Sequence, residues 1–176
     1  MRFTLLDRIT ELQAGVRIQG TKSLTLAEEY LADHFPLFPV MPGVLMLEAM
    51  TQCSAWLVRA SEDFAHSIVT LAEARAVKYA DFVKPGQTLT VTAELLGHDE
   101  RVSKLKVHGA VNGSVNVSAR LTLCRYNLAD LHPDRAASDV IVRAEMRKLF
   151  SLLYQPAKAG TKAHTNGASV PLAATL

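Results

Sequence analysis

The chain has 176 residues, of which 49% are hydrophobic and 20% charged, and this composition is typical of one globular domain. It excludes disordered, collagen-like and disulfide-scaffold proteins. The formal charge of +2 comes from Lys158 and Lys162, because the other 17 of the 19 basic residues balance the 17 acidic ones. A neutral body does not indicate a nucleic-acid partner. No apolar run reaches the roughly 20 residues that span a bilayer, and the start has no signal-peptide pattern, so we expect a cytoplasmic protein without a membrane span.

The first predicted elements are two strands and a stiff loop. Segment 3–24, FTLLDRITELQAGVRIQGTKSL, predicts two short strands around an Ala14-Gly15 turn. Segment 33–43, DHFPLFPVMPG, contains three prolines that stiffen the chain. Because a rigid loop can hold a side chain in one place, His34 is a candidate catalytic residue, although an isolated histidine is more often a surface or core residue.

Segment 42–60, PGVLMLEAMTQCSAWLVRA, predicts one long helix buried nearly all round, with Pro42 at its first position. Its length of roughly 27 Å lets a sheet wrap around it. Glu48 and Gln52 lie one turn apart on this helix, and a buried carboxylate without a partner is costly. The pair therefore suggests a site. A buried glutamate satisfied by the backbone or a neighbouring subunit is the equal alternative.

Gly43 opens the predicted helix, where the first N–H groups have no internal partner and carry the positive end of the helix dipole. The N–H groups of Gly43 and Val44 can hold a developing oxyanion, because the missing side chain lets a substrate carbonyl approach. A glycine that only eases the helix entry is the alternative. The sequence has no metal-ligand spacing, no Gly-rich phosphate loop and no Gly-x-Ser-x-Gly elbow, so we expect neither metal nor cofactor.

From 68 to 126 apolar and polar residues alternate with the period of strands, as in QTLTVTAELL at 87–96. Asn112-Gly113 is a strong hairpin signal. Three or four antiparallel strands are expected here, which gives a sheet of five or six. Cys53 and Cys124 lie in apolar patterns and are expected to be buried thiols without a disulfide.

The last part of the chain predicts a helix and a tail. Apolar residues recur at helical spacing within 134–154, namely Val142, Met146, Leu149 and Leu153. This helix is expected to pack on the sheet or on a partner subunit. We expect an α+β protein with an antiparallel sheet wrapped around one long buried helix. The predicted division is a domain at 1–126, a helical extension at 127–154 and a flexible tail at 155–176.

Segment 34–52, HFPLFPVMPGVLMLEAMTQ, resembles the signature of the FabZ-type 3-hydroxyacyl-acyl-carrier-protein dehydratases, a hotdog-fold family. The family motif reads His-Phe-Pro, two residues, Pro, then Met-Pro-Gly, followed by Glu-Ala-Met-x-Gln on the central helix. The functional positions of this motif hold His34, Gly43, Glu48 and Gln52. The related FabA type has aspartate at the position of Glu48. A weaker resemblance from Phe3 to Tyr126 covers about 70% of the chain.

The resemblance implies dehydration of a (3R)-3-hydroxyacyl thioester on acyl carrier protein to the trans-2-enoyl thioester, in fatty acid or related acyl-chain biosynthesis. It also implies a homodimer, alone or as a trimer of dimers, in which His34 and Glu48 of different subunits share a site. His34 would remove the C2 proton and the Gly43 N–H would hold the thioester oxygen. Direct proton donation by Glu48, and positioning of a water by Glu48 and Gln52, both remain open.

The chain departs from the family pattern at several positions. Asp33 and Leu37 stand where glycine is common, and Ala80 and Asp81 replace a basic pair after Tyr79. Nearby basic residues remain as candidates for docking the acidic carrier protein: Arg75, Lys78 and Lys84. A solvated edge strand is the alternative interpretation of these three. Two other functions stay open, a hotdog acyl thioesterase and a non-catalytic acyl-binding subunit.

Overall fold

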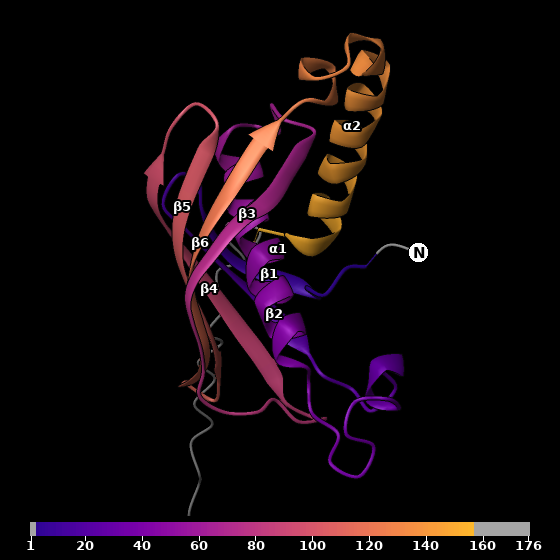
Figure 1. The fold of residues 1–176 in the computed structure, drawn as a ribbon, viewed down its shortest axis with the longest axis vertical. Coiled ribbons are helices and arrows are strands. Elements are labelled where there is room, and N and C mark those ends of the chain that lie inside the picture. Colours follow the sequence, from indigo (N-terminus) through magenta and orange to yellow (C-terminus); the bar gives the residue numbers. More distant parts are fainter. Residues whose placement is uncertain (1–2, 157–176) are drawn as a thin grey trace, which may run out of the picture.

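Helix α1, Gly43–Ser61, runs through the middle of the molecule, and a six-stranded antiparallel sheet curves around it (Figure 1). The computed structural model describes residues 3–156. Across the sheet the strands lie in the order β1-β2-β4-β5-β6-β3. Their bounds are Arg8–Gln13 for β1, Arg17–Ser23 for β2, Ile68–Tyr79 for β3, Thr88–His98 for β4, Val102–Val111 for β5 and Ser114–Tyr126 for β6. The expected α+β hotdog architecture is confirmed.

The two tight turns that the sequence predicts join neighbouring strands. Gly15 has a φ of +74° between β1 and β2. Asn112 and Gly113 have φ values of +50° and +83° between β5 and β6, which is the left-handed pair that a type I′ hairpin requires. The turn pairs Val111 with Ser114, and a bulge between Gly109 and Ala110 then sets the register along the rest of the two strands.

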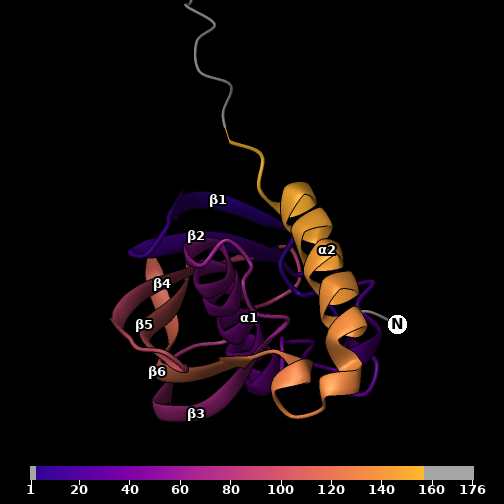
Figure 2. The ribbon, with the colours of Figure 1, turned by 90° about the horizontal axis from the view of Figure 1, so that it is seen from above.

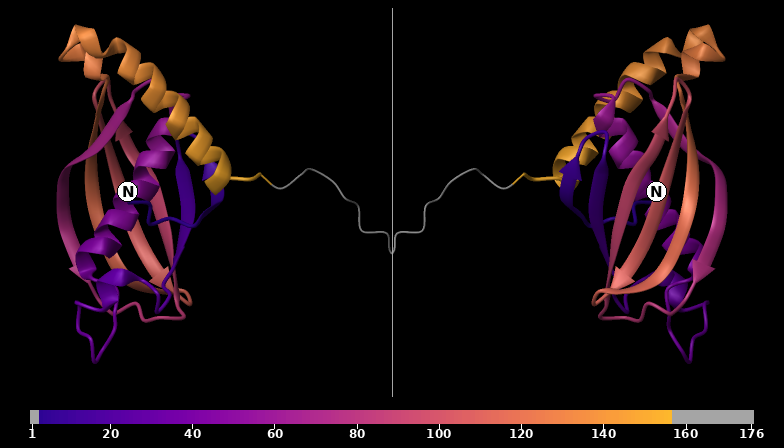
Figure 3. Two further views of the ribbon diagram at one scale, coloured as in Figure 1. Left: turned by 90° about the vertical axis from the view of Figure 1, so that its right-hand side faces the viewer. Right: turned by 90° about the vertical axis from the view of Figure 1, so that its left-hand side faces the viewer.

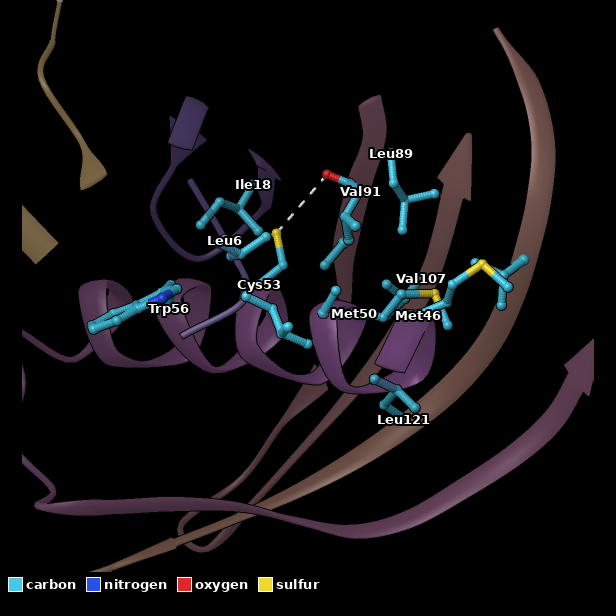
Figure 4. Packing of buried hydrophobic residues seen from close by; sticks show 14 of the residues in the cluster. Leu6, Ile18, Met46, Met50, Cys53, Trp56, Leu89, Val91, Val107 and Leu121 are labelled. Atoms are coloured by element: carbon cyan, nitrogen blue, oxygen red, sulfur yellow. Dashed lines mark hydrogen bonds between the residues drawn. The ribbon is translucent and has the colours of Figure 1, made fainter. Parts of the chain in front are cut away.

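Alternate residues of the strands pack on the inner face of α1 (Figure 4). The strands contribute Leu89, Val91, Leu105, Val107 and Leu121, and the helix contributes Met46, Ala49, Met50, Cys53 and Leu57, all buried. Burial raises the pKa of the Cys53 thiol to about 12, and its Sγ lies 3.9 Å from the carbonyl oxygen of Val91. Cys53 and Cys124 are both free, as expected.

The prediction that α1 is buried nearly all round is wrong for a single chain. The face opposite the core carries half-buried or exposed side chains, which are Val44, Leu47, Glu48, Gln52 and Ala55. Val44 is 70% exposed. Apolar composition along a helix predicts that the residues are covered, but it does not tell whether the same chain covers them.

Helix α2, Ala136–Leu153, lies outside the sheet and beside the C-terminal half of α1 (Figure 2). It follows two short 3₁₀ helices, η2 (Leu128–Asp130) and η3 (Pro133–Arg135), while a third, η1 (Glu29–Leu31), precedes the proline-rich loop. Three of the four residues predicted to face inward do so, since Met146 and Leu149 pack against the core and Leu153 is buried. The fourth, Val142, is half-buried and lies outside the core cluster. Figure 3 shows α2 slanting from the end of β6 down to β1. There Tyr154 forms a parallel bridge with Ile9.

The predicted division of the chain at residue 126 coincides with the end of β6 and stays a prediction. The predicted tail, 155–176, lies outside the described residues apart from its first two. Among residues 3–156, no helix is both long enough and apolar enough to cross a membrane.

Candidate active site

A cavity of about 360 Å³ at the N-terminal end of α1 contains His34. The proline-rich loop, the first residues of α1 and the chain just after β3 form its walls. Its lining residues are His34, Phe35, Val40, Met41, Gly43, Met46, Tyr79, Ala80, Asp81 and Phe82. A mostly apolar pocket with few titratable groups is typical of a site for a small apolar substrate.

The main chain around His34 is held by local hydrogen bonds. The N–H of His34 donates to the carbonyl of Tyr30 at 3.0 Å, and the N–H of Phe38 donates to the carbonyl of Phe35 at 2.7 Å. Phe35 has a φ of +51°, and its ring centroid lies 4.4 Å from that of His34. A positive φ is costly for a bulky aromatic residue, so the loop holds Phe35 in a strained conformation beside His34.

Gly43 opens α1 directly after Pro42, which is the N-cap and not the first helical residue as predicted. The Pro42 carbonyl accepts the first hydrogen bonds of the helix, at 2.9 and 3.1 Å. The N–H groups of Gly43 and Val44 precede these bonds and have no intrahelical acceptor. The ring of Tyr79 lies against Gly43, where an added Cβ would meet the Tyr79 Cε1 atom at 3.1 Å.

Glu48 and Gln52 form a hydrogen-bonded pair on the half-buried face of α1. Gln52 Nε2 donates to Glu48 Oε1 at 2.9 Å and to the carbonyl of Phe3 at 3.0 Å. Gln52 Oε1 accepts from the N–H of Leu5 at 2.9 Å. The amide of Gln52 therefore fixes the Glu48 carboxylate and ties the N-terminal segment to the helix.

His34 and Glu48 do not share a cavity within one chain. Met46 lines the His34 cavity, and Glu48, two residues later, points about 200° further round the helix. The structure thus brings His34 and Gly43 together, and places Glu48 and Gln52 on another face of α1. Within residues 3–156 no group of three or more His, Cys, Asp or Glu is arranged to hold a metal ion.

The FabA-like domain family matches residues 1–120. The 3-hydroxyacyl-acyl-carrier-protein dehydratase FabZ of Caldicellulosiruptor bescii is 38% identical over 113 residues, which cover 64% of this chain and 81% of that protein. The FabZ dehydratase of Bacillus subtilis is 35% identical over 120 residues, which cover 68% and 85%. This chain belongs to the FabA-like family, in its FabZ branch.

Solved structures confirm the hotdog fold of this FabZ-type chain. The dehydratase heterocomplex ApeI:P from Xenorhabdus doucetiae superposes with a TM-score of 0.59 at 22% identity, covering 73% of this chain and 86% of that one. The protein smu.793 from Streptococcus mutans, bound to acetyl CoA, has a TM-score of 0.54 at 15% identity, covering 71% and 91%. At these identities the likeness concerns the fold alone.

The residues that depart from the FabZ-type pattern lie at the surface. Asp33 is exposed, and no ion pair or hydrogen bond joins it to His34 in the described part of the chain. Leu37 is fully exposed at the tip of the loop. Asp81 Oδ1 accepts a hydrogen bond from the N–H of Phe82 at 2.7 Å, which holds the chain that borders the cavity.

The three candidate docking residues of the FabZ-type chain have different surroundings. Arg75 is exposed and its Nε lies 2.7 Å from Glu73 Oε1. Lys84 Nζ lies 5.5 Å from the ring centroid of Phe38, in the loop beside the cavity. Lys78 is exposed directly before Tyr79. Lys84 therefore lies beside the cavity, whereas Arg75 is paired with Glu73 on β3.

Two walls of the cavity, Tyr79 and Phe82, were not singled out as site residues from the sequence. They are 49% and 50% exposed, and the ring of Phe82 meets that of Phe38 edge-on with centroids 5.6 Å apart. The sequence gives only a weak indication of these two residues, since Tyr79 is the last residue of β3 and Phe82 lies beyond the strand. Their contact with the N-terminus of α1 depends on tertiary packing.

Proposed function

We propose that this chain dehydrates (3R)-3-hydroxyacyl thioesters carried by acyl carrier protein to trans-2-enoyl thioesters. The observation that carries the proposal is the cavity in which His34 faces the start of α1, in a chain of the FabZ branch. The reaction breaks the C2–H and C3–O bonds, forms the C2–C3 double bond and releases water. It needs a base, a group that holds the thioester oxygen and an acid.

His34 is the proposed base. A thioester carbonyl makes the C2 proton acidic, and an imidazole suits proton removal near neutral pH. The N–H groups of Gly43 and Val44 hold the thioester oxygen as negative charge develops on it, helped by the positive end of the helix dipole. Preorganised donors of this kind contribute about 10²- to 10³-fold to the rate.

Glu48 of a second copy of the chain is the proposed acid, oriented by Gln52. Within one chain Glu48 points away from the His34 cavity, so a twofold homodimer, alone or repeated in a trimer of dimers, would complete both sites. The exposed apolar side chains around the cavity support such an interface, since patches of this kind mark interaction surfaces. They are Phe35, Leu37, Phe38, Val44, Tyr79 and Phe82.

The proposed contacts for the acidic carrier protein are Lys84, beside the cavity, and Lys78 and Arg75 on β3. Exposed rim charges chiefly steer the encounter of two proteins. The expected location of the protein in the cytoplasm stays a prediction.

The decisive experiment incubates the purified chain with a 3-hydroxyacyl thioester on acyl carrier protein and follows the ultraviolet absorbance of the enoyl product. His34→Ala and Glu48→Gln are each expected to lower kcat by about 10²- to 10⁴-fold, because each removes one proton-transfer group. The matched variants His132→Ala and Glu100→Gln change the same residue types at exposed positions and should retain full activity.

Full activity of both site variants would contradict the proposal. Release of free thiol without enoyl product would identify a thioesterase instead. Tight binding of an acyl thioester without turnover, in a protein with an intact oligomer, would identify a non-catalytic acyl-binding subunit.

A further inference from the structure

A second cavity, of about 300 Å³, lies between α1 and α2, beside the C-terminal half of α1. Its lining is predominantly apolar. Ala55 and Trp56 of α1, Val69 of β3, and Met146 and Leu149 of α2 form its walls. A cavity of this size and character suits an aliphatic group.

This cavity lies along the same face of α1 as Glu48, further toward the C-terminal end of the helix. Gln52 lines the cavity with the same side chain that donates to Glu48 Oε1. Glu48, Gln52 and Ala55 are spaced by four and three residues, which places them on one stripe of the helix. Because the helix rises 1.5 Å per residue, Ala55 lies about 10 Å along the axis from Glu48. A chain that leaves Glu48 along this stripe passes Gln52 and the N-terminal segment bound to it, of which Phe3 and Thr4 also line the cavity.

The order of atoms in the substrate matches this arrangement, and this step rests on the proposed function. The thioester oxygen and C2 would lie at Gly43 and His34 of one subunit, and the C3 hydroxyl group at Glu48 of the other. The remainder of the acyl chain then starts at Glu48 and extends away from the thioester. On that side the stripe of α1 leads to the second cavity.

Helix α2 closes the far wall of this cavity, and it lies beyond residue 120, where the match to the FabA-like family ends. The wall is firmly packed, because the ring centroid of Phe150 lies 5.8 Å from that of Trp56 and 5.4 Å from that of Phe64. Arg59 also lines the cavity, but its Nη1 donates to two main-chain carbonyls, at 3.2 and 3.1 Å. Its aliphatic stem is thus available to an apolar ligand.

We infer that the cavity between α1 and α2 receives the distal end of the acyl chain, and that Met146 and Leu149 limit the chain length that the enzyme accepts. An acyl chain longer than the cavity meets these two side chains. Each methylene group that fits inside gains the free energy of leaving water. A helix outside the conserved family domain would therefore select among substrates of the same reaction.

The experiment measures kcat/KM for carrier-linked 3-hydroxyacyl thioesters of short, medium and long chains. Ala55→Leu fills the cavity from the side of α1 and should lower kcat/KM for long chains by about tenfold relative to short ones, the effect of roughly two excluded methylene groups. Met146→Ala and Leu149→Ala enlarge the cavity and should move the preference toward longer chains. Leu152→Ala, on the same helix but at a side chain 67% exposed, is the matched control and should keep the wild-type profile.

Unchanged chain-length profiles in Ala55→Leu, Met146→Ala and Leu149→Ala would overturn the inference. Should the α2 variants fail to fold, Ala55→Leu decides alone, since it leaves α2 untouched. If the wild-type chain dehydrates no substrate, the proposed function fails, and binding of saturated acyl thioesters tests the cavity separately. Affinity should then rise with chain length in the wild type and not in Ala55→Leu, and an equal rise in both would refute the cavity's role.

Discussion

The ring of Tyr79 lies close to the start of α1, where a Cβ added at Gly43 would meet the ring carbons at 3.1 to 3.3 Å. A methyl group there must push the ring, which is a wall of the His34 cavity, by a few tenths of an ångström. Because displacements of about 1 Å in a site can cost 10²-fold in rate, this smaller shift in Gly43→Ala is expected to lower kcat/KM by about three- to tenfold. Steady-state kinetics measure this loss, and thermal unfolding shows whether the fold is kept.

Gly97→Ala is the matched control for this substitution. An added Cβ at Gly97 has nothing within 4 Å, so the same chemical change should leave the kinetics unaltered. Wild-type kinetics in Gly43→Ala would show that the close contact between helix and ring has no part in catalysis.

The residues of the candidate site could be predicted from sequence only where a local pattern carries them. His34 and Gly43 belong to a proline-rich loop and a helix start, and Glu48 and Gln52 to one helical stripe. The sequence does not reveal that Tyr79 covers Gly43, because this contact joins residues 36 positions apart through the packing of β3 on α1. Nor does it reveal which face of α1 each group occupies relative to the cavity.

Among the elements, α2 contributes one buried carboxylate, that of Asp139, which binds the chain at the end of the sheet. Asp139 accepts hydrogen bonds from the N–H groups of Leu128 and Ala129, at 2.8 and 2.9 Å, and from the hydroxyl of Ser67. Desolvation by burial would raise the pKa of Asp139, but the hydrogen bonds from Ser67, Ala129 and Leu128, aided by the charge of Arg143, outweigh it and lower the pKa. The hydrogen bonds are therefore made to the ionised form of the Asp139 side chain.

The pKa of Asp139 is lower in the folded state than in the unfolded state, so this carboxyl group makes the fold less stable as the pH falls. The carboxylate of Asp139 stabilises the fold fully above the ordinary pKa of about 3.9, and this contribution is lost as the pH falls through the lowered value. Asp139→Asn is expected to have a lower Tm near neutral pH and to lose less Tm than the wild type as the pH falls from about 4 to 2. Thermal unfolding across this pH range measures the difference.

Asp134→Asn, at an exposed position before α2, is the control and should follow the wild-type curve. An Asp139→Asn curve that runs parallel to the wild type throughout would contradict the assigned role of Asp139.

The elements themselves were largely predictable. The strands follow from an alternation that needs only neighbouring residues, and the Asn112-Gly113 turn is confirmed by the φ values of both residues. The burial of α1 was overestimated, because Val44 and Leu47 have the apolar character of core positions, although this chain leaves Val44 exposed and covers Leu47 only in part. Hydrophobic pattern alone does not separate a core face from an interface.

For the whole molecule, the separation of His34 from Glu48 leads to a test of shared sites. His34→Ala and Glu48→Gln chains with different tags can be produced together and the mixed dimer purified through both tags. In such a dimer one site carries both substitutions and the other carries none, so we expect about half of the wild-type activity. The enoyl-product assay measures it against each parent variant, and a mixed dimer as inactive as its parents would refute sharing.

The bridge between Tyr154 and Ile9 gives the two edges of the sheet different properties. The chain that follows α2 covers β1 at this point, and a bulge between Ile9 and Glu11 distorts the same strand. Strand addition is therefore hindered at β1, while among the described residues the outer side of β3 has no strand beside it. A dimer paired through β3 would have a joined sheet that ends in β1 on both sides. Strand pairing would then stop at two chains, and such a dimer would be protected against open-ended polymerisation.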